Sequence, residues 1–299
     1  MALGLAGASI VVMVLAAFTV LFTDEERPKA IAVWAAANFL ALPIGPILGG
    51  WMLTHFWWGW VFLINAASFG AVLTSLALLR TGEFRRAPKA ARKRGNLVEG
   101  FRYVRKRPDI MVILVMIFLI GTFGLNFPIF ISTMAKVTFS AGAAEFGLLS
   151  SVMAIGSVAG ALLSANREKP RMRYLFVAAA AFGVFCAASA VMPSFWLFAL
   201  ALIPVGVAAQ TFMTTANGAV QLGTDAAVRG RVMAIYMAIF MGGTPIGAPI
   251  VGWVANQFGP RWGLGVAAAS GIAALLVGIY WLVKYHGLRV HYAAHRFSL

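Results

Sequence analysis

The chain repeats part of itself within a strongly apolar sequence. Residues 27–73 match residues 229–275 without a gap, at an offset of 202, with 15 of 47 positions identical. The Ala identities count for little in an Ala-rich chain, but the Pro-Ile-Gly of residues 43–45 recurs at residues 245–247. Internal repeats of this kind are typical of membrane transporters built from duplicated helix bundles, whose binding site lies between the halves near the bilayer midplane. The repeat therefore predicts a two-bundle architecture.

The composition places most of the chain in a membrane. Hydrophobic residues make up 61% and charged residues 11%, with a mean hydropathy of +0.87, whereas a soluble domain has roughly 25% charged residues. Apolar runs of about 20 residues cross a bilayer as helices. We therefore expect an all-α, polytopic helix bundle of about nine transmembrane helices, at residues 2–22, 31–53, 57–79, 110–135, 146–165, 174–192, 195–220, 232–255 and 263–284.

The repeat also predicts the domain organisation. Its offset pairs the first three spans with the last three, and the three spans between residues 110 and 192 have no partner upstream. A complete duplication would have six spans in each bundle, so the chain is expected to match spans four to twelve of a twelve-span architecture. The predicted parts are an incomplete N-terminal bundle at 1–80, a basic linker at 81–109, a six-span C-terminal bundle at 110–285 and a tail at 286–299.

The basic residues lie almost entirely on one side of the predicted membrane. The net charge is +15, and alternate loops divide the Lys and Arg residues into 22 on one side and two, Lys136 and Arg261, on the other. This positive-inside pattern places the linker and the C-terminus in the cytoplasm and argues against nucleic acid as the partner. The segment 80–109 holds 11 of these residues, and an amphipathic surface helix is expected over 96–107. We expect it to contact anionic lipid headgroups.

No motif for a cofactor, metal or catalytic centre is recognisable in the sequence. The single cysteine, Cys186, lies in an apolar run, and the His residues of the tail have no Cys or acidic partner at metal-binding spacing. A Gly-Lys-Ser/Thr phosphate-binding motif is absent from the sequence. We therefore expect neither an enzyme nor a cofactor, and the partners expected are the lipid bilayer and a small-molecule substrate. Self-association is not predicted either way.

Several segments resemble the major facilitator superfamily of transporters. Residues 45–50 (GPILGG) resemble the fifth-helix motif of its drug–proton antiporters, and residues 60–65 (WVFLIN) resemble the start of their sixth helix. Residues 99–108 and 229–236 are similar to the branch that exports siderophores and macrolides in bacteria. The resemblance implies a carrier in the cell (inner) membrane that works by alternating access.

The resemblance also implies a cytoplasmic gate. Residues 160–167 are similar to the gating loop of the family, with Ser164 where an Asp is usual. The gate candidates are Arg167, Arg229 and Arg231. All nine acidic residues lie in loops or at helix ends of the predicted map, so the sequence does not predict how transport is coupled to energy.

Gly and Pro residues recur in the second and eighth spans. Pro removes a helical hydrogen bond and Gly allows close approach of a neighbouring backbone, so such helices are expected to bend or to pack tightly at the seam between bundles. Ordinary helix packing is the alternative interpretation, but recurrence in both halves favours the seam. The candidates for gating or helix bending are Gly45, Pro46, Gly49, Gly50, Pro245, Gly247, Pro249 and Gly252.

Uncharged polar residues form a stripe on the seventh span. Gln210, Thr214, Asn217 and Gln221 are spaced at i, i+4, i+7 and i+11, which places them on one helix face. They line a substrate pathway or form hydrogen bonds between helices, and the spacing leaves both interpretations open. Asn126, close to Pro128, and Asn38 are weaker candidates for the pathway.

Together these patterns predict a transmembrane transporter, most simply an exporter of small amphipathic molecules such as a drug, macrolide or siderophore. The alternative is a transport-inactive truncated fragment with a structural or partner-binding role.

Overall fold

The computed structural model describes residues 44–77, 97–165, 171–225 and 228–286, and every regular element among these residues is helical. The predicted all-α fold is therefore confirmed. The chain divides into two compact units: unit 1 takes in residues 1–95 and 143–151, and unit 2 takes in residues 96–142 and 152–299.

Unit 1 is described by a helix at residues 44–55, by α3 (Gly59–Ala77) and by the first turns of α7 (Ala143–Ala165). The predicted spans 31–53 and 57–79 are thus described in part, whereas 2–22 lies outside the described residues.

Unit 2 has five spans of its own, and α7 continues into it. Its helices are α4 (Leu97–Lys106), α5 (Pro108–Leu119), η2 (Ile120–Gly124), α6 (Phe127–Thr133), η3 (Met134–Thr138), α8 (Met172–Ala190), α9 (Phe195–Gly223), α10 (Arg229–Phe258) and α11 (Pro260–His286). Among the described residues, six stretches are long and apolar enough to cross a membrane, at Pro108–Thr138, Ala143–Ser164, Met172–Ala190, Phe195–Gly223, Arg229–Phe258 and Pro260–Tyr285. These six correspond to the last six predicted spans.

The ends of these helices follow from local sequence. Pro108 and Pro260 each occupy a first helical position, where the missing N–H of proline costs no hydrogen bond. Gly259, just before α11, has a φ of 101°, a left-handed conformation that glycine adopts without strain. The hydroxyl of Ser194 accepts a hydrogen bond from the backbone N–H of Leu197 at 3.4 Å and caps the start of α9.

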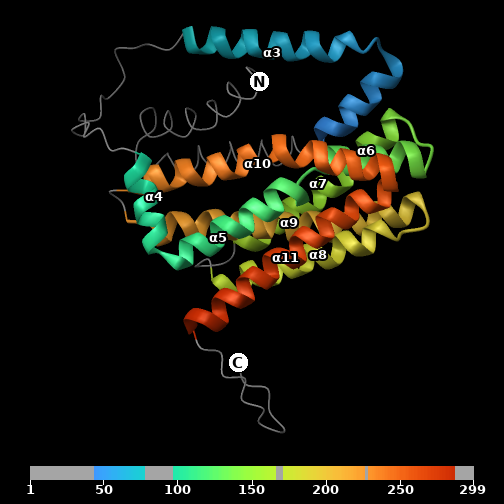
Figure 1. Ribbon diagram of the computed structural model, residues 1–299. Helices are drawn as coiled ribbons and strands as arrows, with labels where there is room; N and C mark the ends of the chain where they lie inside the picture. The colour runs from blue at the N-terminus through green and yellow to red at the C-terminus, as the bar shows by residue number, and fades with distance from the viewer. Residues whose placement is uncertain (1–43, 78–96, 166–170, 226–227, 287–299) are drawn as a thin grey trace. The chain divides into compact units, whose positions relative to one another are not determined.

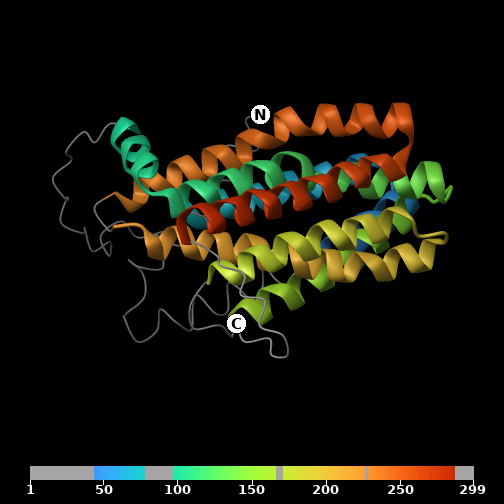
Figure 2. The same cartoon turned by 60° about the horizontal axis from the view of Figure 1, so that its bottom comes forward.

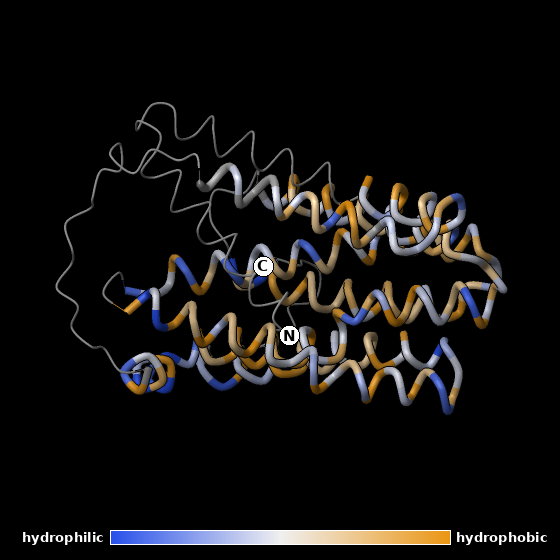
Figure 3. The backbone as a smooth tube through the Cα atoms, turned by 90° about the horizontal axis from the view of Figure 1, so that it is seen from above, coloured by the Kyte–Doolittle hydropathy of each residue, from blue (hydrophilic) through white to orange (hydrophobic). Residues whose placement is uncertain are grey.

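The long helices of unit 2 run side by side (Figure 1). α8 packs between α9 and α11, while η2 packs against α10 and α11. Large side chains such as Ile117, Phe182 and Phe212 are fully buried between them. Hydrophilic residues gather toward the ends of the long helices (Figure 3). Figure 2 shows α4 lying across the start of α5, at an angle to the long helices.

The fourth predicted span is interrupted near its middle. The α-helical turns of α5 widen into the π-helical turn η2, and the chain leaves helical geometry at Leu125 and Asn126 before α6 begins. Pro128 lies within the first turn of α6 and donates no backbone hydrogen bond to the preceding turn. The side chain of Asn126 donates to the carbonyl oxygen of Thr122 at 2.7 Å. This amide therefore stabilises the interruption itself.

Candidate substrate site

The polar stripe of α9 borders a hollow between α9 and α10. The hollow has a volume of about 420 Å³, within the range of roughly 300–1,000 Å³ that is usual for small-molecule sites. Three of the predicted residues, Gln210, Thr214 and Asn217, are part of its lining. The lining is completed by Met213, Gly218, Tyr236, Met237 and Phe240. The fourth predicted residue, Gln221, is exposed and lies outside this lining.

Two of the stripe residues bond to each other along the helix. The Thr214 hydroxyl donates to the backbone carbonyl oxygen of Gln210 at 2.8 Å, and the Gln210 side-chain amide donates to the Thr214 hydroxyl oxygen at 3.4 Å. A hydroxyl that bonds to the preceding turn in this way is held in one rotamer. The amide carbonyl of Gln210 can still accept a hydrogen bond from a ligand in the hollow.

Tyr236 on α10 is a lining residue that the sequence analysis did not single out. It is only 1% exposed, and its hydroxyl has no hydrogen-bond partner of good geometry among the described residues. The side chain of Asn217 on α9 approaches this hydroxyl. A buried tyrosine hydroxyl normally has a partner. The wall of the hollow therefore contains a buried phenol hydroxyl with the Asn217 side chain close to it.

The chemistry of the hollow is uncharged. None of the described residues in its lining is acidic or basic; the polar groups are amides and hydroxyls, and Met and Phe side chains provide the apolar surface. Such a lining can hold an amphipathic molecule by apolar contact and orient it through a few hydrogen bonds.

Asn126 is not part of this hollow. It is 3% exposed, and its amide is engaged with Thr122 as described above. Thr122 in turn packs against α10 at two glycines, since a Cβ added to Gly243 would meet its hydroxyl and one added to Gly247 would meet its carbonyl oxygen. Asn126 thus lies in the contact between η2 and α10. Asn38 lies outside the described residues.

The Gly and Pro candidates differ in what surrounds them. α10 continues as one helix through Pro245 and Pro249. A Cβ on Gly247 would collide with the carbonyl oxygen of Thr122, whereas one on Gly252 would have no described atom within 4 Å. Close packing therefore accounts for Gly247 but not for Gly252.

The candidate glycines of unit 1 also include one that is closely packed and others that have no close neighbour among the described residues. A Cβ on Gly50 would lie 2.9 Å from the carbonyl oxygen of Ala143, whereas one on Gly45 or Gly49 would have no described atom within 4 Å. Pro46 contacts α7 through its carbonyl oxygen, which faces Gly147. In the repeat, Gly50 matches Gly252 and Gly45 matches Gly247, so the tight contacts fall on unmatched positions of the two halves.

Two of the gate candidates make defined contacts at the end of unit 2 where α4 lies. Arg231 forms an ion pair with Glu99 of α4. The guanidinium of Arg229 donates to the carbonyl oxygen of Thr224 through two nitrogens, each at 3.3 Å. Arg167 lies outside the described residues.

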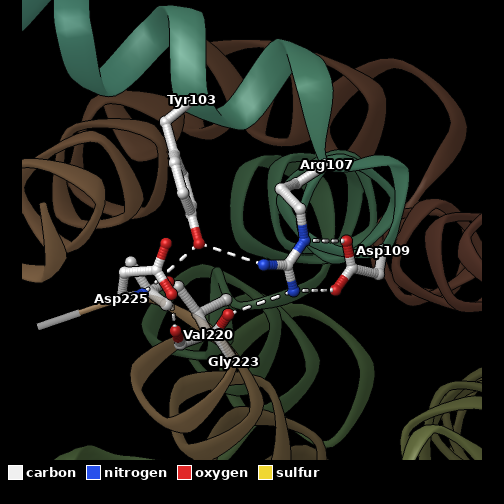
Figure 4. A network of polar contacts seen from close by, with 7 residues as sticks. Tyr103, Arg107, Asp109, Val220, Gly223 and Asp225 are labelled. Atoms are coloured by element: carbon white, nitrogen blue, oxygen red, sulfur yellow. Dashed lines mark hydrogen bonds and ion pairs between the residues drawn. The ribbon is translucent and has the colours of Figure 1, made fainter.

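A second polar network at this end was not predicted from the sequence (Figure 4). Arg107, between α4 and α5, donates to both carboxylate oxygens of Asp109, at 2.9 and 2.6 Å. It also donates to the hydroxyl oxygen of Tyr103 at 3.0 Å and to the carbonyl oxygen of Gly223 at 3.1 Å. The Tyr103 oxygen accepts a further bond from the backbone N–H of Asp225 at 3.3 Å.

This network joins α4 and α5 to the end of α9. Hydrogen bonding to Asp109 raises the pKa of Arg107, so the guanidinium stays charged. Its acidic partner, Asp109, lies in the first turn of α5.

Comparison with known proteins agrees with this architecture. The sequence profile of the Major Facilitator Superfamily matches residues 1–224 and 128–295. The chain belongs to this superfamily. The two matches overlap at 128–224, as expected when a family is built from duplicated bundles. The family match and the six long apolar helices of the described residues together indicate an integral membrane protein of this superfamily.

Individual relatives are export and resistance proteins. The chain is 41% identical over 68 residues to the probable multidrug resistance protein EmrY of Escherichia coli, and this match covers 22% of the chain and 13% of EmrY. It is 44% identical over 64 residues to the methyl viologen resistance protein SmvA of Salmonella typhimurium, covering 21% and 13%. It is 43% identical over 63 residues to the multidrug efflux pump LfrA of Mycolicibacterium smegmatis, and this match covers 21% of the chain and 12% of LfrA. The chain thus matches about an eighth of the length of each relative.

Proposed function

We propose that this chain is an exporter of small amphipathic molecules, such as a drug, macrolide or siderophore, and that its substrate pathway includes the hollow between α9 and α10. The observation that carries the proposal is the meeting of a predicted polar stripe with the buried Tyr236 hydroxyl across that hollow. The relatives support export over the transport-inactive alternative, because those described above are resistance or efflux proteins.

The proposed mechanism is alternating access between two bundles in the inner membrane. In this proposal the glycines without close neighbours among the described residues, Gly45, Gly49 and Gly252, lie at the moving seam. The contacts of Arg229 and Arg231 near α4 close the cytoplasmic side. The basic segment 80–109 and the C-terminus face the cytoplasm, where the segment contacts anionic headgroups.

The proposal is tested by efflux of a fluorescent amphiphile from cells that express the chain. Asn217→Leu removes a polar group from the hollow and is expected to change efflux while membrane abundance stays as in the wild type. Asn256→Leu is the matched control, because Asn256 is exposed on α10 outside the lining.

Two results would contradict the proposal. A fall in abundance that accounts for the whole change in efflux would show that Asn217 holds helices together instead. A correctly inserted wild-type chain that exports no amphiphile would favour the transport-inactive alternative.

A further inference from the structure

A second, apolar furrow runs between α5 and α10. Two adjacent hollows, of about 680 and 500 Å³, share Phe101 of α4, Phe118 of α5, and Ile235 and Ile239 of α10. Because they share these walls, they form one continuous depression, which we call the α5–α10 furrow. It has no lining residue in common with the substrate hollow.

The furrow is apolar along its length and charged only at the end formed by α4. All its described lining residues are hydrophobic or glycine except Arg102 and Arg105. Large side chains in the wall stay open to the surroundings, with Phe101 60% and Phe118 41% exposed. In a membrane-spanning unit an exposed apolar channel of this kind is open to the acyl chains of the bilayer.

The two arginines at the mouth are available to a ligand. Among the described residues, no ion pair involves Arg102 or Arg105, whereas the nearby acids Glu99 and Asp109 are paired with Arg231 and Arg107. The mouth therefore carries two positive charges, and the two acids beside it are already neutralised by other arginines. An occupant with an anionic head complements it.

The depth of the furrow matches one leaflet of a bilayer. On α10 its lining runs from Ala234 to Ile246, which at a rise of about 1.5 Å per residue is roughly 18 Å. Half of a hydrocarbon core of roughly 30 Å is about 15 Å. A single acyl chain that starts at the headgroup level would therefore fill the furrow to the midplane.

We infer that the α5–α10 furrow binds one anionic phospholipid, with its phosphate at Arg102 and Arg105 and one acyl chain along α5 and α10. The inference rests on the proposed position of α4 at the headgroup level but not on the substrate hollow. Diffuse attraction of a basic loop to a membrane needs no particular residue. A defined lipid-binding site, by contrast, depends on these two arginines and on the open channel beside them.

The test is native mass spectrometry of the purified, delipidated chain with phosphatidylglycerol or phosphatidylcholine of identical acyl chains. We expect the wild type to retain phosphatidylglycerol at a concentration about 25-fold lower than the concentration at which it retains phosphatidylcholine. Each arginine is expected to contribute about fivefold to this preference. The double variant Arg102→Gln/Arg105→Gln should lose this preference. Lys106→Gln is the matched control, since Lys106 is exposed on the same helix outside the lining, and it should keep the preference.

A second variant tests the channel without changing charge. Ala238→Phe places a bulky ring in the furrow and should abolish retention of phosphatidylglycerol, while thermal unfolding in detergent shows that the variant is folded. Equal retention of the two lipids by the wild type would overturn the inference, and this comparison needs no variant. Equal losses in Lys106→Gln and the double variant would show diffuse attraction only.

Dimers of the chain that Ala238→Phe dissociates would show that a second copy occupies the furrow instead, and would also overturn the inference. Efflux measured on the same variants separates the two proposals. If the lipid preference is lost while efflux is unchanged, the proposal for the substrate hollow is unaffected. If Asn217→Leu does not alter efflux, the proposal for the lipid site is unaffected.

Discussion

α9 packs very differently against two of its neighbours, α7 and α10. Toward α7, backbones touch: a Cβ on Gly156 would meet the carbonyl oxygen of Ile203, one on Gly160 that of Val207, and one on Gly206 that of Met153. Toward α10, side chains hold the helices apart around a hollow of about 420 Å³. Small residues on both sides of a seam let two membrane helices pack as one body. The difference indicates that α9 and the part of α7 in unit 2 form a fixed pair, whereas the side of α9 toward α10 has room for a ligand.

The largest expected effect comes from breaking the tight seam. Gly156→Leu would drive a branched side chain into the backbone at Ile203, and we expect the free energy of unfolding to fall by about 3 kcal/mol or more. Thermal unfolding in detergent measures it. Gly252→Leu is the matched control and should leave stability nearly unchanged, because no described atom lies within 4 Å of a Cβ there. Equal destabilisation by the two variants would contradict the contrast between the seams.

Two variants of α10 test whether close packing or helix bending explains its glycines. Gly247→Ala should lower stability by about 2 kcal/mol, because the new methyl group meets the carbonyl of Thr122. Gly252→Ala should instead raise stability by up to about 1 kcal/mol, the usual gain in helix propensity. Unfolding curves of the two variants side by side give the answer. If Gly247→Ala kept full stability but altered efflux, bending would be the better account of this glycine.

Tyr236→Phe tests whether the side of α9 that faces α10 contributes to substrate binding. Removing a buried hydroxyl that has no hydrogen bond of good geometry among the described residues should leave stability the same or raise it by about 1 kcal/mol. The apparent affinity for substrate should nevertheless fall by about 2- to 10-fold, as for the loss of one hydrogen bond. Concentration-dependent efflux measures this change, and Tyr280→Phe, at an exposed tyrosine of α11, should have no effect. A clear loss of stability would mean that Tyr236 and Asn217 clamp the two helices together.

The smallest effect is expected where the end of α9 is tied to α4 and α5. Tyr103→Phe removes the acceptor of bonds from Arg107 and from the N–H of Asp225, and it should cost about 0.5–1 kcal/mol because the site is partly exposed. A double-mutant cycle with Arg107→Gln should give a coupling energy of similar size. Additive effects of the two changes would show that the phenol and the guanidinium act independently.

The spans of the C-terminal part could be predicted from hydropathy alone, because a helix that crosses lipid must carry its own apolar length. Helix periodicity also predicted that Gln210, Thr214 and Asn217 share one face, and this face lines the hollow. Tyr236 was missed because an aromatic residue in an apolar run resembles any core residue. Its significance depends on the packing of α10 against α9, which no local pattern encodes.

The polar contacts near α4 were missed for a similar reason. Arg231 and Glu99 are 132 residues apart, and Tyr103 and Asp225 are 122 apart, so their pairing follows only from the tertiary fold. The repeat likewise located the glycines but not their partners. Gly50 and Gly247 make the close contacts although they are not matched by the repeat.

The uncharged lining of the α9–α10 hollow has a consequence for how the membrane potential acts on it. An elementary charge moved across a membrane gains or loses about 2.3 kcal/mol per 100 mV, but the described lining holds no charge for the field to act upon. Occupancy of the hollow by a neutral molecule should therefore be the same in energised and de-energised vesicles. Each charge on a substrate would add its own voltage dependence, so cargo, rather than this part of the protein, would set the electrical sensitivity of binding.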